Sequence, residues 1–187
     1  MKEMSSIKKA SISALCIALC YVLPMVFHAF AIGGVISPMH IPVYICGLIC
    51  GPFYGAFCGI AGPVVSCLLT SMPTVTQLIS MVPELMVYGF TCGLLMKLVH
   101  TRSIYLDIYI SMIPAMLLGR IIGGLASALF YLSMSSNESY SFSLWATAYF
   151  VETIPGSILQ LILVPALILA LMRAKLIPEH KKKEAKA

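Results

Sequence analysis

Three ionisable side chains lie inside long apolar stretches of this sequence and could do chemistry there: Glu84, Arg120 and Glu152. A charge at membrane depth is costly unless it is paired or hydrated, so each of the three needs a partner or a ligand. Counted inward from the outer ends expected for their segments, Glu84 and Glu152 lie roughly 12 Å deep. Arg120 lies near the middle of its segment, so the three side chains can meet in one cavity in the outer half.

Two interpretations of this polar set remain open. In the first, it lines a cavity for a small ligand together with four further polar residues: His40, Tyr44, Gln77 and Gln160. In the second, Arg120 pairs with Glu84 or Glu152 and only holds three helices in register. We favour the ligand cavity, because two carboxylates compete for one guanidinium. For His40 alone, capping or packing is the alternative to ligand contact.

The composition indicates what kind of protein positions these residues. The chain has 187 residues, of which 60% are hydrophobic and 10% charged, with a mean hydropathy of +0.97. Too little polar surface is available to cover a water-soluble globule. Long, continuous apolar runs favour helices over a barrel, and the length admits roughly five to seven spans. We therefore predict an all-α membrane protein with one membrane domain over 1–187 and no attached nucleotide-hydrolysing domain.

The cations predict the orientation of the chain. Eleven of the 12 Lys and Arg residues fall at the two ends or near residue 100: Lys2, Lys8, Lys9, Lys97, Arg102, Arg173, Lys175, Lys181, Lys182, Lys183 and Lys186. Positive residues collect on the cytoplasmic side, so both termini should face inward and the number of spans should be even. This placement points to an orientation signal and not to a nucleic-acid partner, although the basic tail 173–187 could touch lipid headgroups.

Glycine, proline and charge divide the chain into six expected spans, at about 8–27, 40–50, 53–70, 77–98, 104–134 and 144–172. The breaks include Gly51-Pro52, which can end one helix and begin the next. The first span resembles a signal peptide with a cleavage site at Ala29-Phe30-Ala31, but we expect it to be retained. The seven cysteines lie in apolar stretches without the pattern of a zinc site, so we expect small buried packing residues and no metal.

Small residues recur at four-residue spacing in several of these spans. The pairs Gly55/Gly59, Gly89/Gly93 and Gly119/Gly123 predict close helix packing, which is structural. A further stripe, Ala10, Ala14 and Ala18, lies near the cytoplasmic end of the first span. Its periodicity fits contact with a neighbouring helix of this chain or with a helix of another protein.

Short motifs follow one another along the chain: Pro38-Met39-His40-Ile41-Pro42-Val43, Gly47, Gly51-Pro52-x-Tyr54-Gly55, Pro83-Glu84-Leu85-x-x-Tyr88-Gly89, Gly119-Arg120, and Ile154-Pro155-Gly156 with Gln160 and Pro165. In this pattern, in size and in the six expected spans, essentially the whole chain resembles the substrate-binding S components of energy-coupling factor (ECF) transporters. Such proteins capture a vitamin or related micronutrient on the outer side of a prokaryotic plasma membrane.

The resemblance also implies partners. S components associate with a transmembrane T component and two cytoplasmic ATPases, which use the ATP, so no cofactor and no enzymatic activity are expected in this chain. The family's coupling surface is an alanine stripe on the first helix, which Ala10, Ala14 and Ala18 match. By overall appearance the pantothenate and riboflavin S components are nearest, and Arg120 would suit an anionic group such as a carboxylate.

Two rival functions would use the same polar residues. An intramembrane enzyme could use His40 with Glu84 or Glu152 on a metal or as acid and base, but no H-E-x-x-H or similar spacing supports it. An autonomous proton-coupled carrier could use the two glutamates as proton sites, but the internal repeats common in such carriers are not found. Dependence of uptake on an ATPase partner would distinguish these functions.

Overall fold

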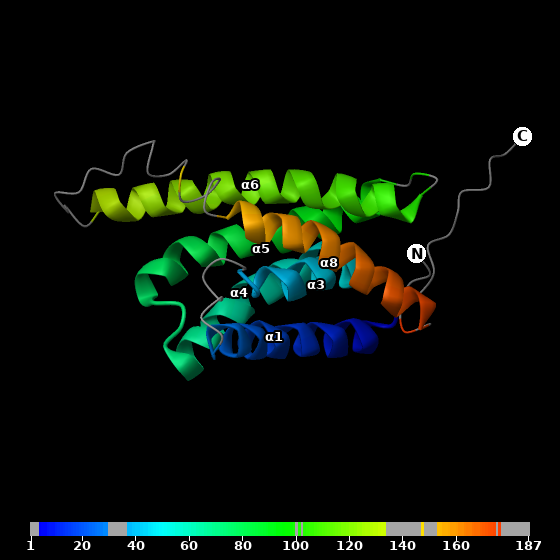
Figure 1. Ribbon diagram of the computed structural model, residues 1–187, viewed down its shortest axis with the longest axis horizontal. Helices are drawn as coiled ribbons and strands as arrows, with labels where there is room; N and C mark the ends of the chain where they lie inside the picture. The colour runs from blue at the N-terminus through cyan, green and yellow to red at the C-terminus, as the bar shows by residue number, and fades with distance from the viewer. Residues whose placement is uncertain are drawn as a thin grey trace, which may run out of the picture.

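The computed structural model describes residues 4–29, 37–99, 101, 103–133, 147, 153–174 and 176. Six α-helices are formed by these residues (Figure 1): α1 (Ser6–Ala29), α3 (His40–Cys50), α4 (Pro52–Thr70), α5 (Val75–Leu98), α6 (Ile104–Ser133) and α8 (Ile154–Arg173). The helices lie roughly along one common direction, and α5 packs against α3, α4 and α6. The expected α-helical bundle is therefore confirmed.

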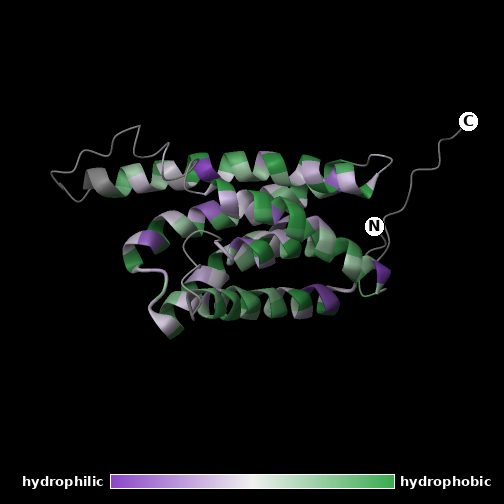
Figure 2. Ribbon diagram, viewed as in Figure 1, coloured by the Kyte–Doolittle hydropathy of each residue, from purple (hydrophilic) through white to green (hydrophobic). Residues whose placement is uncertain are grey.

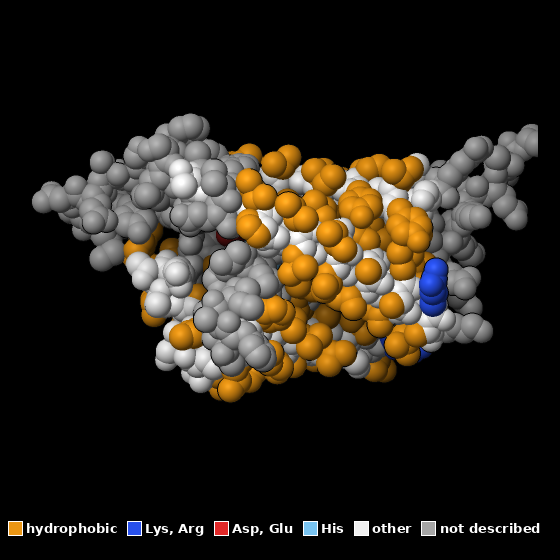
Figure 3. Space-filling view, viewed as in Figure 1, with side chains coloured by type: hydrophobic (Ala, Val, Ile, Leu, Met, Phe, Trp, Pro, Cys, Tyr) orange, Lys and Arg blue, Asp and Glu red, His pale blue; other side chains and the backbone are white. Residues whose placement is uncertain are grey.

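Five of the helices are long and apolar enough to cross a membrane: α1, α4, α5, α6 and α8. Their outer surfaces are largely hydrophobic, as Figures 2 and 3 show. The exception is α3, whose 11 residues extend only about 16 Å at 1.5 Å per residue. A hydrocarbon core about 30 Å thick exceeds that length, so α3 alone does not make a full crossing. The count of six spans and the orientation of the termini stay predictions.

The helix ends follow the breaks seen in the sequence. Gly51 ends α3 with φ +100°, a conformation that favours glycine, and Pro52 starts α4. The Lys97 side chain at the end of α5 lies against Gly51. Cys50 at the end of α3 donates its thiol to the Lys9 carbonyl, 3.6 Å away, near the start of α1. The start of α1 with Lys9, the end of α3 and the end of α5 with Lys97 therefore share one end of the bundle. We call this the basic end.

Glycines bring the backbones of α3, α4 and α5 into direct contact. A Cβ on Gly55 would collide with the Gly89 carbonyl, and one on Gly93 would lie 2.6 Å from the Pro52 nitrogen and 2.7 Å from the Gly47 oxygen. Such contacts are possible only without side chains. The glycine pairs on α4 and α5 therefore have the close-packing role expected of them.

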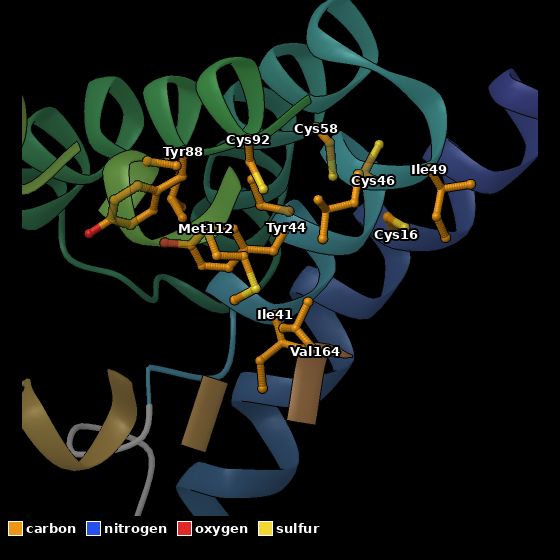
Figure 4. Packing of buried hydrophobic residues seen from close by; sticks show 14 of the residues in the cluster. Cys16, Ile41, Tyr44, Cys46, Ile49, Cys58, Tyr88, Cys92, Met112 and Val164 are labelled. Atoms are coloured by element: carbon orange, nitrogen blue, oxygen red, sulfur yellow. The ribbon is translucent and has the colours of Figure 1, made fainter. Parts of the chain in front are cut away.

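Buried thiols join α1 to this glycine-rich core (Figure 4). Six of the seven cysteines are buried, Cys67 is partly buried, and all seven are free. The Cys46 sulfur lies 3.3 Å from the Ser13 hydroxyl, and Cys20 donates to the Met39 carbonyl over 3.6 Å. These are the small, weakly hydrogen-bonding packing groups that the sequence suggested.

Candidate functional site

Polar side chains from α3 and α5 meet away from the basic end. The Tyr88 hydroxyl donates to Glu84 Oε1 over 2.7 Å, and His40 Nε2 lies 3.9 Å from the same oxygen. His40 Nδ1 lies 3.1 Å from the Ser37 carbonyl, which fixes the imidazole from its other side. The His40 side chain is 11% exposed, so the imidazole lies beside Glu84 inside the bundle and not at its surface.

Three aromatic rings pack together beside this carboxylate, two of them stacked and the third tilted. The Tyr88 ring lies 5.3 Å from the His40 ring and 5.3 Å from the Tyr44 ring, with Tyr44 and Tyr88 stacked at 26°. In Figure 4 both phenol oxygens point to the same side, away from the cysteines. Among the described residues, the buried Tyr44 hydroxyl has no hydrogen-bond partner. A buried polar group of this kind calls for an explanation, such as a ligand.

Arg120 extends the cluster to α6 and α8. Its guanidinium donates to the Ser157 hydroxyl, which in turn donates to the Thr153 carbonyl over 2.7 Å. Arg120 directly follows Gly119, which lies against the Tyr88 ring, so α6 brings the guanidinium to the same region. One polar network, which we call the polar cluster, therefore contains His40, Tyr44, Glu84, Tyr88, Arg120 and Ser157, contributed by four helices.

The depth of the polar cluster can be counted along α5. Glu84 lies nine residues after Val75, where α5 begins, which corresponds to about 13 Å of helix. The Glu84 side chain is 12% exposed, so it is largely enclosed by protein. A carboxylate, a guanidinium and phenol hydroxyls at this depth can bind a small polar molecule through charged hydrogen bonds.

The other candidate residues are Gln77, Gln160 and Glu152. Gln77 is exposed in the first turn of α5, where its Oε1 accepts the Thr74 backbone N–H over 3.3 Å. The amide therefore caps the helix. Gln160 is buried on α8, about one turn beyond Ser157. Glu152 lies outside the described residues, so its expected place in the cavity and its pairing with Arg120 stay predictions.

Three polar residues of interest were not singled out by the sequence. Tyr88 lies one helical turn after Glu84, and this i, i+4 spacing was the available signal. Ser157 had no signal, because its link to Arg120 joins residues 37 apart in the chain. Asp107 is fully buried in the first turn of α6, where Oδ1 accepts the Thr101 N–H over 2.7 Å and so fastens the connection before the helix.

Metal chemistry finds no support in the part of the chain that the structure describes. No group of three or more His, Cys, Asp or Glu side chains there could hold a metal ion. His40 and Glu84 lie 3.9 Å apart, and Glu84 accepts a hydrogen bond from Tyr88. These contacts are not those of a metal-ligand set.

The comparison with protein families decides the identity of the chain. The family model for the ECF transporter, substrate-specific component, matches residues 8–168. The chain belongs to this family. The matched part contains every residue of the polar cluster and all of α1, α3, α4, α5 and α6 beyond residue 7. Searches among curated proteins and among solved structures found no match.

Membership, together with the apolar helices, makes this S component a multi-pass membrane protein and a substrate-binding subunit of a transporter. The family is one of transporters and not of enzymes. The resemblance seen in the sequence is thereby confirmed.

Proposed function

We propose that this S component captures a vitamin that carries an anionic group, and that the polar cluster is its binding site. The observation that supports this most is the meeting of Glu84, Tyr88 and Arg120 inside an apolar bundle, beside a buried Tyr44 hydroxyl without a described partner. Buried polar groups of this density are expensive in a membrane unless they serve a purpose.

Each group has a task in this proposal. Arg120, oriented by Ser157, binds the anionic group of the vitamin through its planar fork of N–H donors. Glu84 accepts a hydrogen bond from a hydroxyl or amide group of the vitamin, because its charge is already stabilised by Tyr88 and lies close to His40. The Tyr44 hydroxyl supplies a further donor or acceptor. Gln160 and Glu152 complete the wall on the side of α8.

Pantothenate fits these tasks better than riboflavin. Pantothenate carries a carboxylate, an amide and hydroxyl groups on a small skeleton, whereas riboflavin has no carboxylate to meet Arg120. The rings of Tyr44 and Tyr88 could instead stack on the flavin ring of riboflavin. Pantothenate binding therefore depends on Arg120, and riboflavin binding would depend on the two tyrosines.

The outward face of α1 supports coupling to a partner. Ala10, Ala14 and Ala18 are all exposed on α1, whereas Ser13, Cys16 and Cys20 face the bundle. Packing against another helix in the described part of the chain therefore does not account for the stripe. We assign it to contact with a T component that works with two cytoplasmic ATPases, which hydrolyse the ATP, so this chain needs no cofactor of its own. The cations then face the cytoplasm of a prokaryotic cell.

Binding by the purified chain tests the proposal. Isothermal titration with pantothenate and with riboflavin, paired with native mass spectrometry for any co-purifying molecule, should show one bound pantothenate per chain. Binding of riboflavin but not of pantothenate would indicate that the stacked tyrosines, and not Arg120, make the main contact with the vitamin. A chain that binds neither vitamin and co-purifies with no small molecule would contradict capture of a vitamin.

A proton-coupled carrier is the second candidate, because His40 and Glu84 lie 3.9 Å apart and could share a proton. The two functions differ in their need for ATPases. Uptake of radiolabelled pantothenate in cells that express this chain alone would support the carrier. Uptake only when a T component and ATPases are co-expressed would support the S component.

A further inference from the structure

The glycine pair on α6 differs from the pairs on α4 and α5 in what it contacts. A Cβ on Gly55, Gly59 or Gly89 would meet backbone atoms of a neighbouring helix. A Cβ on Gly119 would collide first with the Tyr88 ring and would lie 3.1 Å from the Glu84 carbonyl oxygen, and one on Gly123 would lie 3.0 Å from both Cβ and Oε2 of Glu84. The missing side chains on α6 therefore make room for two side chains of the polar cluster.

These two side chains are linked to each other and to the rest of the cluster. The Tyr88 hydroxyl donates to Glu84 over 2.7 Å, and the Tyr88 ring lies between Gly119 on one side and the Tyr44 and His40 rings, each 5.3 Å away. The ring cannot move away from α6 without disturbing this stack. The surface of α6 at Gly119 and Gly123 thus sets where the phenol and the carboxylate lie.

From this geometry we infer that Gly119 and Gly123 are positioning residues of the substrate site, which act through Tyr88 and Glu84. The inference rests on the proposed function, because it assigns them a role in binding and not in packing alone. Arg120 directly follows Gly119 in α6, so the same helix surface places all three groups.

Substitution by alanine should disturb the neighbouring side chains more at Gly119 than at Gly123. At Gly119 the new methyl group meets a bulky ring that is packed on its other face, so the ring must be displaced. At Gly123 the methyl group meets both Cβ and the carboxylate of Glu84. The carboxylate can rotate away, and the 3.0 Å contact with Cβ relaxes if the neighbour shifts by a few tenths of an ångström. Gly123→Ala is therefore the more informative variant, since it should move the carboxylate and leave the fold intact.

A fluorine label at Tyr88 tests the placement without any ligand. 3-Fluorotyrosine incorporated at position 88 gives one ¹⁹F resonance that reports the ring environment and its hydrogen bond to Glu84. Both Gly119→Ala and Gly123→Ala should shift this resonance. The matched control is Gly62→Ala, whose Cβ would lie 2.9 Å from the Cys20 side chain on α1 and meets neither Tyr88 nor Glu84. The control should leave the resonance in place.

Pantothenate affinity, measured by titration on the same variants, tests the role in binding. Gly123→Ala should weaken binding at least about tenfold, comparable to the loss of a hydrogen bond to a charged group, at a melting temperature near that of the control. In a Glu84→Asp background the shorter side chain leaves more room, so the additional loss caused by Gly123→Ala should shrink.

The outcomes separate this inference from the proposed function. An unshifted ¹⁹F resonance in both α6 variants would overturn it, whatever the chain binds. A shifted resonance with unchanged pantothenate affinity would also overturn it and leave vitamin capture standing. If the unmodified chain bound neither pantothenate nor riboflavin, the choice of vitamin would fail, while the ¹⁹F measurement would still decide whether the glycines position Tyr88 and Glu84.

Discussion

At the scale of single residues, the two stacked tyrosines have opposite hydrogen-bonding states. The Tyr88 hydroxyl is bonded to Glu84, whereas the equally enclosed Tyr44 hydroxyl has no partner among the described residues. A bonded hydroxyl stabilises the fold, and an unbonded one costs free energy until something binds it. Matched phenylalanine substitutions can therefore separate stability from ligand binding.

Tyr44→Phe removes a hydroxyl that makes no hydrogen bond with the described residues. Its melting temperature should stay the same or rise, while pantothenate affinity should fall. Tyr88→Phe removes a hydrogen bond to a buried carboxylate and should lower the free energy of unfolding by about 1 to 3 kcal/mol. Thermal denaturation and titration on both variants check this. An equal loss of stability in the two variants would contradict the assignment of Tyr44 to the ligand.

Arg120 can be tested by keeping its charge and changing its shape. Arg120→Lys loses the planar fork, so pantothenate binding should weaken by about 1.5 to 3 kcal/mol, the range for a charged hydrogen bond. If Arg120 were only a structural partner of a carboxylate, removing it would strand that charge and lower stability first. Affinity and melting temperature of Arg120→Lys and Arg120→Gln distinguish these cases. Reduced stability with near-normal affinity would move the ligand toward His40 and Tyr44.

The candidate site was only partly predictable from the sequence. Glu84 and Arg120 were found because charge is rare in apolar runs, and His40 and Tyr44 because they lie one turn apart. Gln77 carried the same polar signal, yet its amide caps α5, since a helix start leaves backbone N–H groups to satisfy. The links from His40 to Glu84 and from Arg120 to Ser157 join distant residues, and no local pattern encodes such links.

At the scale of elements, the sequence marks where helices break, whereas the offset between neighbouring helices appears only in the structure. The expected span 40–50 coincides with α3, because Pro38 and Gly51-Pro52 mark both ends. The sequence did not reveal that α3 starts beside the middle of α5, since only a tertiary contact brings His40 to Glu84. The glycine pairs looked alike in sequence, although two contact backbone and the third contacts side chains.

The exposed alanines of α1 give a prediction at this scale. Ala14→Trp should prevent close approach of a partner helix, while the polar cluster about 15 Å or more along the bundle stays undisturbed. Uptake in cells with the T component and ATPases should fall strongly, and pantothenate binding by the purified chain should be unchanged. Ile162→Trp, at an exposed position on α8, is the control and should affect neither. Loss of binding in Ala14→Trp would make the stripe part of the fold.

At the scale of the whole molecule, the arrangement of the cations predicts the topology. An impermeant maleimide applied to intact cells should label a cysteine at Ser139, which lies outside the described residues, and not one at Ser103. The native thiols can largely remain, because six are buried and only Cys67 is partly buried, so Cys67→Ser suffices as background. Labelling of the Ser103→Cys variant only after permeabilisation completes the control. Labelling of that variant in intact cells would contradict the cytoplasmic placement of the basic end.

The shortness of α3 has a consequence for the electrical integrity of the membrane. Between the polar cluster and the basic end, the chain offers only the roughly 16 Å length of α3, sealed where Gly47 and Gly55 lie against Gly89. When an opened cavity lets water reach the polar cluster, most of the transmembrane voltage would fall across this thin layer, because water conducts and the packed helices do not. Substitutions that loosen the glycine contacts should therefore appear first as a leak of ions, before any loss of the ability to hold a vitamin.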